Sequence, residues 1–404
     1  MANHIYIHIP FCIKKCGYCS FYSVVYDEDL VEKYVDFLSD EIETSPLPPP
    51  KRRGSSRVQT IYFGGGTPSL LKPLDIEKII SKFDLSDVKE ITLEVNPATV
   101  FFNKNDNKSV DNSLGGCRKG YSLSDYRGLG INRLSLGTQS MKDTELEFLG
   151  RVHKVQDVIS LYENGLSEIF ENISHDLIYG LPNQSLSDVE YSLREILKFK
   201  PEHLSIYNLS LEENVPLYKY NSQLPSDDLV ADMYYLIRDI MLGNGYVQYE
   251  LSSFCKPNKE SLHNLSYWSF KDYLGFGAGA CGFVDGYRYE NPELEGYIAS
   301  KRINPPNPSK IPPTPLYKGG NMAFFKKGWI LVKDLEKEYI ITGLRKAEGI
   351  SLSDYEERFG HSFLEKYSKP LKKMLENGYI EVDNFIRLCP DYYFTSNEVL
   401  CEFI

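Results

Sequence analysis

One stretch near the start of the chain decides its fold: Ile5-Tyr6-Ile7-His8-Ile9-Pro10-Phe11-Cys12-Ile13-Lys14-Lys15-Cys16-Gly17-Tyr18-Cys19. Its first five residues have the alternating, β-branched pattern of a strand, and Pro10 ends that strand. We therefore expect the three cysteines to lie in a loop at the carboxyl end of a strand. Open α/β sheets and barrels carry their chemistry at this end.

The spacing of Cys12, Cys16 and Cys19 allows three interpretations. Three thiolates can hold a four-iron cluster and leave one iron open for another ligand, although four cysteines are usual. A zinc site would need a fourth ligand, for which His8 is a candidate. The cysteines could also be buried core thiols, because Cys is among the most buried residue types. The position of the cysteines in a loop after a strand favours the cluster.

The composition narrows the class of protein. The chain has 404 residues, enough for two or three domains, and its net charge of -11 argues against a nucleic-acid partner. We find no apolar run of about 18 residues that could span a membrane, and no room for a signal peptide before the first strand. The eight cysteines do not form the pattern of a disulfide framework. These features predict a protein of the reducing cytoplasm.

Strand-like and helix-like segments alternate through the first two thirds of the chain. A helix is predicted at 29–42, and strands are predicted at 5–9, 58–63, 91–95, 133–137, 176–179 and 203–207. This alternation predicts right-handed βαβ units and a parallel sheet, either open or closed into a barrel. About six such units are visible, fewer than the eight of a complete barrel.

Proline-rich and polar segments predict the domain boundaries. Residues 301–330 contain six prolines and Gly319-Gly320, so we expect a linker there between a first domain at 1–300 and a second at 331–404. Two further loops or insertions are predicted at 46–54 and 102–120.

The second domain is predicted to contain helices followed by a small hairpin. Leu364, Tyr367, Leu371 and Met374 have the spacing of one helix face, and the strand expected at 378–382 follows them. This order is typical of a winged-helix-like domain. Winged helices often bind DNA, but the balance of basic and acidic residues argues against that here.

Glycines and polar residues follow several of the predicted strands. Gly64-Gly65-Gly66-Thr67 comes after the strand that ends at Phe63, where it would let the backbone approach a ligand and expose N–H groups; it could also be a plain turn. It fits neither a dinucleotide fingerprint nor a P-loop.

Four more polar residues lie at or beyond strand ends, namely Glu94, Gln139, Arg151 and Asp176. A buried carboxylate is costly unless it is paired. The two acids are therefore either members of structural salt bridges or recognise a cationic, hydroxyl-bearing ligand. In the second case Arg151 would bind a carboxylate of that ligand through two hydrogen bonds.

A third cluster is His263-Asn264-Leu265-Ser266-Tyr267-Trp268. Histidine can ligate iron, and the flat faces of Tyr267 and Trp268 suit a macrocycle. A lone histidine near aromatic residues more often has a structural role, so both interpretations stay open on the residues alone.

Together these motifs resemble the radical S-adenosylmethionine superfamily, and within it the group around oxygen-independent coproporphyrinogen III oxidase. The resemblance is carried by the three cysteines, by Phe63-Gly64-Gly65-Gly66-Thr67-Pro68, by Asp176-Leu177-Ile178-Tyr179-Gly180-Leu181-Pro182 and by Ser396-Asn397-Glu398-Val399-Leu400. It implies an α/β fold, a partial (β/α)6 barrel with a mainly helical, winged-helix-like C-terminal domain. It also implies that Cys12, Cys16 and Cys19 hold a 4Fe-4S cluster whose open iron binds S-adenosylmethionine.

The resemblance also implies which residues contact S-adenosylmethionine. These are Tyr6, Tyr18, Gly65, Gly66, Thr67, Glu94, Gln139, Arg151 and Asp176, with Tyr207 and Ser210 at weaker positions.

Two features separate the subfamilies within this group. The oxidases carry an additional cysteine two residues after the third, and this chain has Phe21 there. The motif His263-Asn264-x-x-Tyr267-Trp268 is similar to the signature of the HemW haem chaperones. That resemblance implies haem as a further cofactor, bound by His263, Tyr267 and Trp268, and acceptor haemoproteins as partners, membrane-associated ones among the candidates. It allows a homodimer. The alternative is oxidative decarboxylation of coproporphyrinogen III through a 5′-deoxyadenosyl radical.

Overall fold

The computed structural model describes residues 2–45, 57–101, 121–299 and 330–403. The loops predicted at 46–54 and 102–120 lie outside the described residues, as does the predicted linker apart from Ile330.

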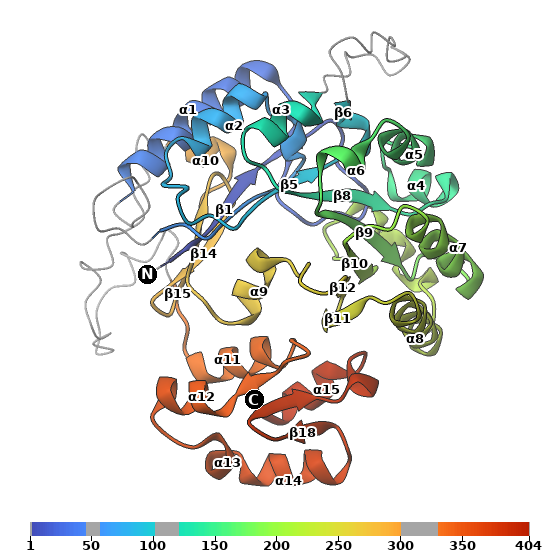
Figure 1. Cartoon of the computed structure of the whole chain (residues 1–404), viewed down its shortest axis with the longest axis vertical. Coiled ribbons are helices and arrows are strands. Elements are labelled where there is room, and N and C mark those ends of the chain that lie inside the picture. The colour runs from blue at the N-terminus through green and yellow to red at the C-terminus, as the bar shows by residue number, and fades with distance from the viewer. Residues whose placement is uncertain (1, 46–56, 102–120, 300–329, 404) are drawn as a thin grey trace.

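Six parallel strands form the centre of the fold, and they lie side by side in chain order (Figure 1). They are β1 (His4–Ile9), β4 (Thr60–Gly65), β5 (Glu90–Val95), β8 (Arg133–Gln139), β9 (Ile173–Tyr179) and β10 (His203–Asn208). All six correspond to strands predicted from the sequence. The two outer members do not pair with each other: β1 continues to β13 (Tyr273–Phe276) and β10 to β12 (Ser253–Cys255). The predicted partial (β/α)6 barrel is therefore confirmed.

Helices cover the convex face of this sheet (Figure 1), and the side chains on that face are mainly apolar. Ile5, Ile7 and Ile9 of β1 are fully buried in a core that includes Tyr34 and Leu38 of the first helix. That helix begins after Asp27, whose carboxylate accepts a hydrogen bond from the Leu30 N–H. The main outer helices are α1 (Glu28–Thr44), α2 (Pro73–Ile80), α3 (Leu123–Gly128), α5 (Val155–Glu163), α7 (Leu186–Leu197) and α8 (Asp227–Gly243).

The concave face is polar, unlike the Val, Ile and Leu layers that fill most barrels. Side chains of neighbouring strands pair there: His4 with Thr60, Ser135 with Asp176, and Ser174 with His203. The short helix α9 (Leu262–Trp268) lies on this side of the sheet (Figure 1). Its first N–H groups, those of Leu262 and His263, donate to the carboxylate of Glu90 at 2.9 and 3.0 Å. The polar interior is thus partly closed by α9.

An antiparallel extension continues the sheet beyond β13. Its strands are β14 (Cys281–Val284), β15 (Tyr287–Glu290) and β16 (Ile330–Leu331), and at the opposite edge β11 (Val247–Glu250) pairs with β12. The remaining helices of this part are α4 (Asp143–Leu149), α6 (Leu166–Ile169) and α10 (Leu294–Ala299). In the described part of the chain, no helix is long and apolar enough to cross a membrane.

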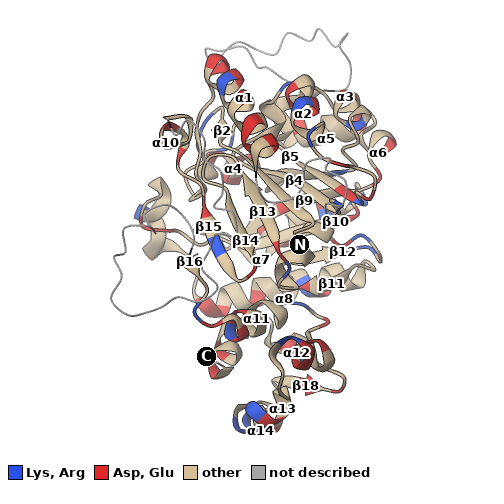
Figure 2. Ribbon diagram, turned by 90° about the vertical axis from the view of Figure 1, so that its left-hand side faces the viewer, with Lys and Arg blue, Asp and Glu red and all other residues tan. Residues whose placement is uncertain are grey.

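The C-terminal region contains five helices around a three-stranded sheet. The helices are α11 (Leu335–Gly343), α12 (Leu352–Phe359), α13 (Phe363–Lys366), α14 (Ser368–Glu376) and α15 (Ser396–Leu400); the strands are β17 (Ile350–Ser351), β18 (Ile380–Val382) and β19 (Phe385–Leu388). The hairpin of β18 and β19 confirms the predicted order of helices followed by a hairpin. Lys and Arg are interspersed with Asp and Glu over the ribbon in Figure 2.

The helix predicted through Leu364 and Met374 is wrong in one respect, because it is two helices that meet at Tyr367. Pro370 explains the break: inside one continuous helix its ring would clash with the carbonyl group of Lys366. As a result Leu364 is 42% exposed and does not share the buried face of Leu371 and Met374.

One carboxylate ties the helices of the C-terminal region together. Glu336 of α11 accepts hydrogen bonds from the hydroxyl groups of Tyr355 and Tyr367 and from the ammonium group of Lys366 at 2.6 Å. The imidazole Nε2 of His361 lies 3.4 Å from the same carboxylate. Partial burial raises the pKa of Glu336, but these contacts outweigh it and lower the pKa to about 2.

We expect Glu336→Gln to lower the free energy of unfolding of the C-terminal region by about 2 kcal/mol, because the hydroxyl and ammonium donors lose their charged acceptor. Since the folded-state pKa lies below the unfolded one, the carboxylate contributes its full stability above about pH 4.5 and loses it as the pH falls towards 2. The stability of the Glu336→Gln variant should therefore fall less than that of wild type as the pH drops below about 4.5. Hydrogen exchange of residues 335–388 at pH 7 and pH 3.5 measures both effects. Exposed Glu356→Gln is the control, and equal protection in Glu336→Gln and wild type would contradict the role.

Candidate functional site

The loop that carries the three cysteines is fixed at its base and along its length. Cys12 ends β2 (Phe11–Cys12), which pairs with β3 (Val24–Val25) and so ties the two ends of the loop together. Between them, the Gly17 N–H donates to the Leu149 carbonyl at 3.0 Å, and the Gly17 carbonyl accepts from the Leu217 N–H at 2.9 Å. The loop is therefore held against the carboxyl ends of the barrel strands.

The three sulfur atoms line one cavity of about 470 Å³. The Thr67 hydroxyl donates to Cys12 Sγ at 3.7 Å, and Arg151 Nη1 donates to Cys16 Sγ at 3.4 Å. All three cysteines are free and partly exposed. Burial raises the pKa of the Cys12 and Cys19 thiols, so a metal centre would have to displace their protons.

The geometry argues against two of the three interpretations of this triad. His8 is buried, and its ring nitrogens hydrogen-bond with the Tyr6 hydroxyl at 3.0 Å and the Tyr22 carbonyl at 2.9 Å, so it is not available as a zinc ligand. Within the described ranges, no three His, Cys, Asp or Glu side chains are grouped to hold one metal ion. A four-iron cluster does not need such convergence, because each thiolate binds a different iron. The three cysteines are partly exposed, which also argues against the interpretation that they are buried core thiols.

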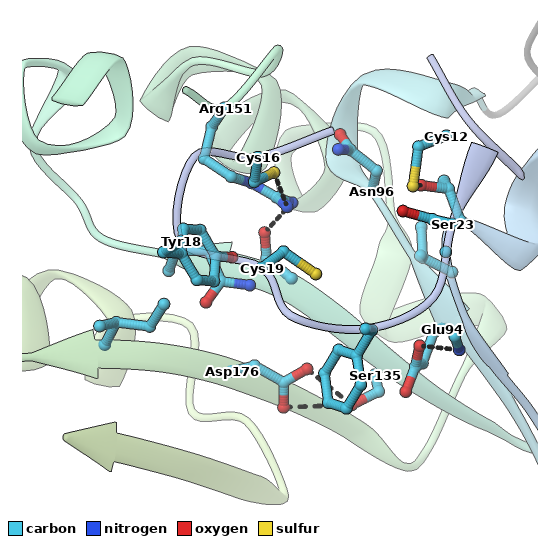
Figure 3. A pocket seen from close by; sticks show the side chains of 18 of the residues that line it. Cys12, Cys16, Tyr18, Cys19, Ser23, Glu94, Asn96, Ser135, Arg151 and Asp176 are labelled. Atoms are coloured by element: carbon cyan, nitrogen blue, oxygen red, sulfur yellow. Dashed lines mark hydrogen bonds between the residues drawn. The ribbon is translucent and has the colours of Figure 1, made fainter. Parts of the chain in front are cut away.

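Two half-buried carboxylates lie across the cavity from the cysteines (Figure 3). Glu94 accepts hydrogen bonds from the Tyr62 hydroxyl at 2.8 Å and the Gly65 N–H at 3.1 Å, and Asp176 accepts from the Ser135 hydroxyl at 3.1 and 3.2 Å. Burial, together with the charge of Asp176, raises the pKa of Glu94 to about 7. Burial also raises the pKa of Asp176. A cationic ligand would stabilise both acids in their ionised form.

Most residues that the sequence placed at the site are brought together in this cavity. It is lined by Tyr18, Gly65, Gly66, Thr67, Glu94, Gln139, Arg151, Asp176, Tyr207 and Ser210 as well as the cysteines. Gln139 has φ of 63°, which is unusual for a residue other than glycine, and lies where the pairing of β8 with β9 shifts register. Such strain is commonly retained at binding sites.

Arg151 is anchored by protein contacts. Besides Cys16, its guanidinium donates to the Gly137 carbonyl at 2.7 Å and to His153 Nδ1 at 3.4 Å. Its charge therefore lies beside a cysteine sulfur, where it would stabilise a thiolate. It keeps further N–H groups for a ligand, because a guanidinium has five.

Tyr6 does not line the cavity but supports its wall. Its ring stacks on Tyr62 with a centroid separation of 6.2 Å, and its hydroxyl contacts His8.

The expectation that Gly64-Gly65-Gly66-Thr67 exposes N–H groups is wrong. The strand β4 continues through Gly65, whose N–H donates to Glu94, while the N–H groups of Gly66 and Thr67 donate to the carbonyls of Ile9 and Phe11, both at 2.8 Å. Gly66 is needed here because a Cβ atom would lie 2.7 Å from the Phe11 carbonyl oxygen.

The predicted haem residues lie on α9 and outside the cysteine cavity. His263 is fully buried, and its ring nitrogens hydrogen-bond with the Thr60 hydroxyl at 2.8 Å and the Tyr267 hydroxyl at 2.7 Å. Its ring also stacks on Tyr62 at 5.1 Å. Trp268 carries the guanidinium of Arg345 over its ring at 5.1 Å. Of this motif, Asn264 lines the cysteine cavity.

Sequence reasoning missed one charged residue that is buried in the wall of the cavity. Arg133 is 1% exposed, and among the described residues its Nε and Nη1 atoms have no hydrogen-bond partner. Arg133, Ser135, Gly137 and Gln139 follow one another at every second position of β8, and all line the cavity. This period of two was visible in the sequence and could have identified them.

Known proteins share both the sequence and the fold. The Radical SAM superfamily model matches residues 6–196, and the HemN C-terminal domain model matches residues 332–388. The chain is 34% identical to the heme chaperone HemW of Buchnera aphidicola subsp. Schizaphis graminum, covering 93% of this chain and 91% of that protein. It is 32% identical to the heme chaperone HemW of Bacillus subtilis, covering 99% and 98%.

The chain belongs to the HemW family of the radical SAM superfamily. Among solved structures, coproporphyrinogen III oxidase (HemN) from Escherichia coli has a TM-score of 0.74 and 20% identity, covering 100% of this chain and 90% of that chain. At this identity the similarity shows the fold alone. Membership of the superfamily implies a 4Fe-4S cluster and S-adenosylmethionine. The three thiols, the carboxylates of Glu94 and Asp176, and Arg151 are groups suited to both.

The cavity yields a prediction for Arg133. Its charge lowers the pKa of Asp176 against the effect of burial, so Arg133→Met should raise the pKa of that acid further and weaken its hold on a cationic ligand. We expect the variant to bind S-adenosylmethionine about tenfold more weakly, a loss of about 1.4 kcal/mol. Arg133→Lys should retain part of the affinity. Equilibrium dialysis of the anaerobically reconstituted proteins measures it, with cluster absorbance as the folding control; equal affinity in all three would contradict the role.

Proposed function

We propose that this protein is a haem chaperone, which binds haem and transfers it to acceptor haemoproteins. The observation that carries the proposal is the identity of 32–34% to curated HemW chaperones along nearly the whole length of both chains. The 4Fe-4S cluster, S-adenosylmethionine and haem are the cofactors that we propose for it.

Phe21 supports the chaperone over the coproporphyrinogen oxidase alternative. It stands where the oxidases are expected to have an additional cysteine, and its side chain is 68% exposed at the cavity. A phenyl ring offers no ligand or redox chemistry at this position. The similarity to the HemN structure concerns the fold and does not favour the oxidase.

We propose that Cys12, Cys16 and Cys19 would hold the cluster, which when bound supplies one iron with an open coordination position. The residues of the chain would then orient the second ligand. Glu94 and Asp176 would accept hydrogen bonds from its ammonium or ribose groups, and Arg151 would bind its carboxylate while stabilising the charge on Cys16. Tyr18, Gly65, Gly66, Thr67 and Gln139 would complete the wall.

For haem, we propose that α9 is the binding element, with His263, Tyr267 and Trp268. Both nitrogens of His263 are engaged within the protein, so direct ligation of iron would require it to give up Thr60 or Tyr267. In the described conformation His263 would instead position Tyr267 and Trp268. We further propose haemoproteins as the acceptors, membrane-associated ones among them, and a homodimer as one possible assembly.

Two parallel assays distinguish the chaperone from the oxidase. The protein is reconstituted anaerobically and divided between a haem titration and a reaction with coproporphyrinogen III, S-adenosylmethionine and a reductant. We expect haem binding at micromolar concentration, transfer to an apo-haemoprotein, and no catalytic formation of protoporphyrinogen. Turnover in the second assay, or no haem binding in the first, would contradict the proposal. A Phe21→Cys variant tests whether that position alone separates the two activities.

We expect His263→Ala to weaken haem binding while leaving the cluster spectrum intact, because the change disrupts α9 and not the cysteine loop. Titration at the Soret band measures the affinity. Thr60→Val is the matched variant, since it removes one hydrogen bond of His263 and keeps the imidazole. Unchanged haem affinity and transfer rate in His263→Ala would remove His263 from the proposal.

A further inference from the structure

A second cavity, of about 770 Å³, lies between α9 and the C-terminal region. We call it the α9 groove. Trp268 at the end of α9, Tyr339 of α11 and Phe385 of β19 give it aromatic walls, and Lys271 and Lys346 give it two ammonium groups. No residue of the cysteine loop lines it. It therefore combines aromatic side chains with ammonium groups, apart from the candidate cluster site.

Lys346 is the most informative residue of the α9 groove. Its side chain is 14% exposed, and Glu348, the carboxylate within ion-pair distance of it, is 4.0 Å away and itself 69% exposed. A pair this long and this open to water contributes little. Burial disfavours the charged form and lowers the pKa of Lys346. A largely buried ammonium with so weak a partner would be stabilised by an anionic group of a ligand.

The aromatic residues of the α9 groove are held in place by cations. The Arg345 guanidinium lies over the ring of Trp268 at 5.1 Å, and that of Arg358 lies over the ring of Tyr339 at 5.3 Å. Such contacts fix the planes of the rings. The acidic lining residues Glu348, Asp354 and Glu357 are all exposed, so water screens their attraction for the largely buried Lys346.

We propose that the α9 groove is the haem site, with the porphyrin ring against Trp268 and a propionate carboxylate on Lys346. This inference rests on the proposed chaperone function and adds the place and the recognised groups. Haem is a flat apolar ring with two carboxylates, which matches the two kinds of surface in the groove.

This placement also fits the task of a carrier. In the α9 groove, haem would contact the ring of Trp268 and the ammonium group of Lys346. The imidazole of His263 would stay hydrogen-bonded inside the barrel. Haem held without a strong iron–nitrogen bond can be passed on. The groove and the cysteine cavity share α9, since Asn264 lines one and Trp268 the other.

The test compares haem with haem dimethyl ester, which has the same ring and no carboxylate charge. Both are titrated into the reconstituted full chain of wild type, Lys346→Gln and Lys346→Arg. We expect wild type to prefer haem over the ester, Lys346→Gln to bind haem about tenfold more weakly and the ester equally well, and Lys346→Arg to stay near wild type. Exposed Lys369→Gln is the control, and Trp268→Ala should weaken both ligands.

The outcomes separate this inference from the proposed function. If wild type binds no haem, the chaperone proposal fails. If wild type binds haem but Lys346→Gln keeps the full preference over the ester, the groove assignment is overturned while the chaperone proposal stands. Affinity for S-adenosylmethionine and the cluster absorbance should be unchanged in Lys346→Gln, because the cysteine cavity does not include this residue.

Discussion

The burial of ionisable side chains inside an open half-barrel is the constraint on which the rest of the structure depends. Glu94, Asp176 and Arg133 face one cavity, and each would be costly there without partners. Tyr62, Gly65 and Ser135 provide hydrogen bonds to the two acids, but Arg133 keeps two nitrogen atoms without a partner among the described residues. A site of this kind is prepared for a polar ligand.

The outer part of the fold follows from that constraint. Because one face of every central strand is committed to polar groups, the core must be built on the other face, where Ile5, Ile7 and Ile9 pack against α1. The polar interior is partly closed by α9, whose first N–H groups donate to Glu90. The same helix borders the α9 groove through Trp268. It thereby gives the cluster cavity and the proposed haem site one common element.

Much of this arrangement could be predicted from the sequence, because local patterns determine it. The six strands follow from β-branched alternation, and polar residues at strand ends converge whenever parallel strands share an edge, which brought Glu94, Gln139 and Asp176 together. One expectation failed because it depended on tertiary pairing. The N–H groups of Gly66 and Thr67 are used by β1 and β2, and no local pattern shows that. The break before Pro370 was readable in the sequence, whereas the weak pairing of Lys346 needed the structure.

The central claim is that the three-cysteine loop holds a four-iron cluster with one iron open to the acid-lined cavity. Electron paramagnetic resonance of the anaerobically reconstituted, reduced protein, recorded with and without S-adenosylmethionine, tests it most directly. The account predicts a 4Fe-4S signal that changes when S-adenosylmethionine is added, and no such signal in a variant with Cys16→Ser. A signal indifferent to S-adenosylmethionine, or a chain that binds zinc and no iron, would contradict it.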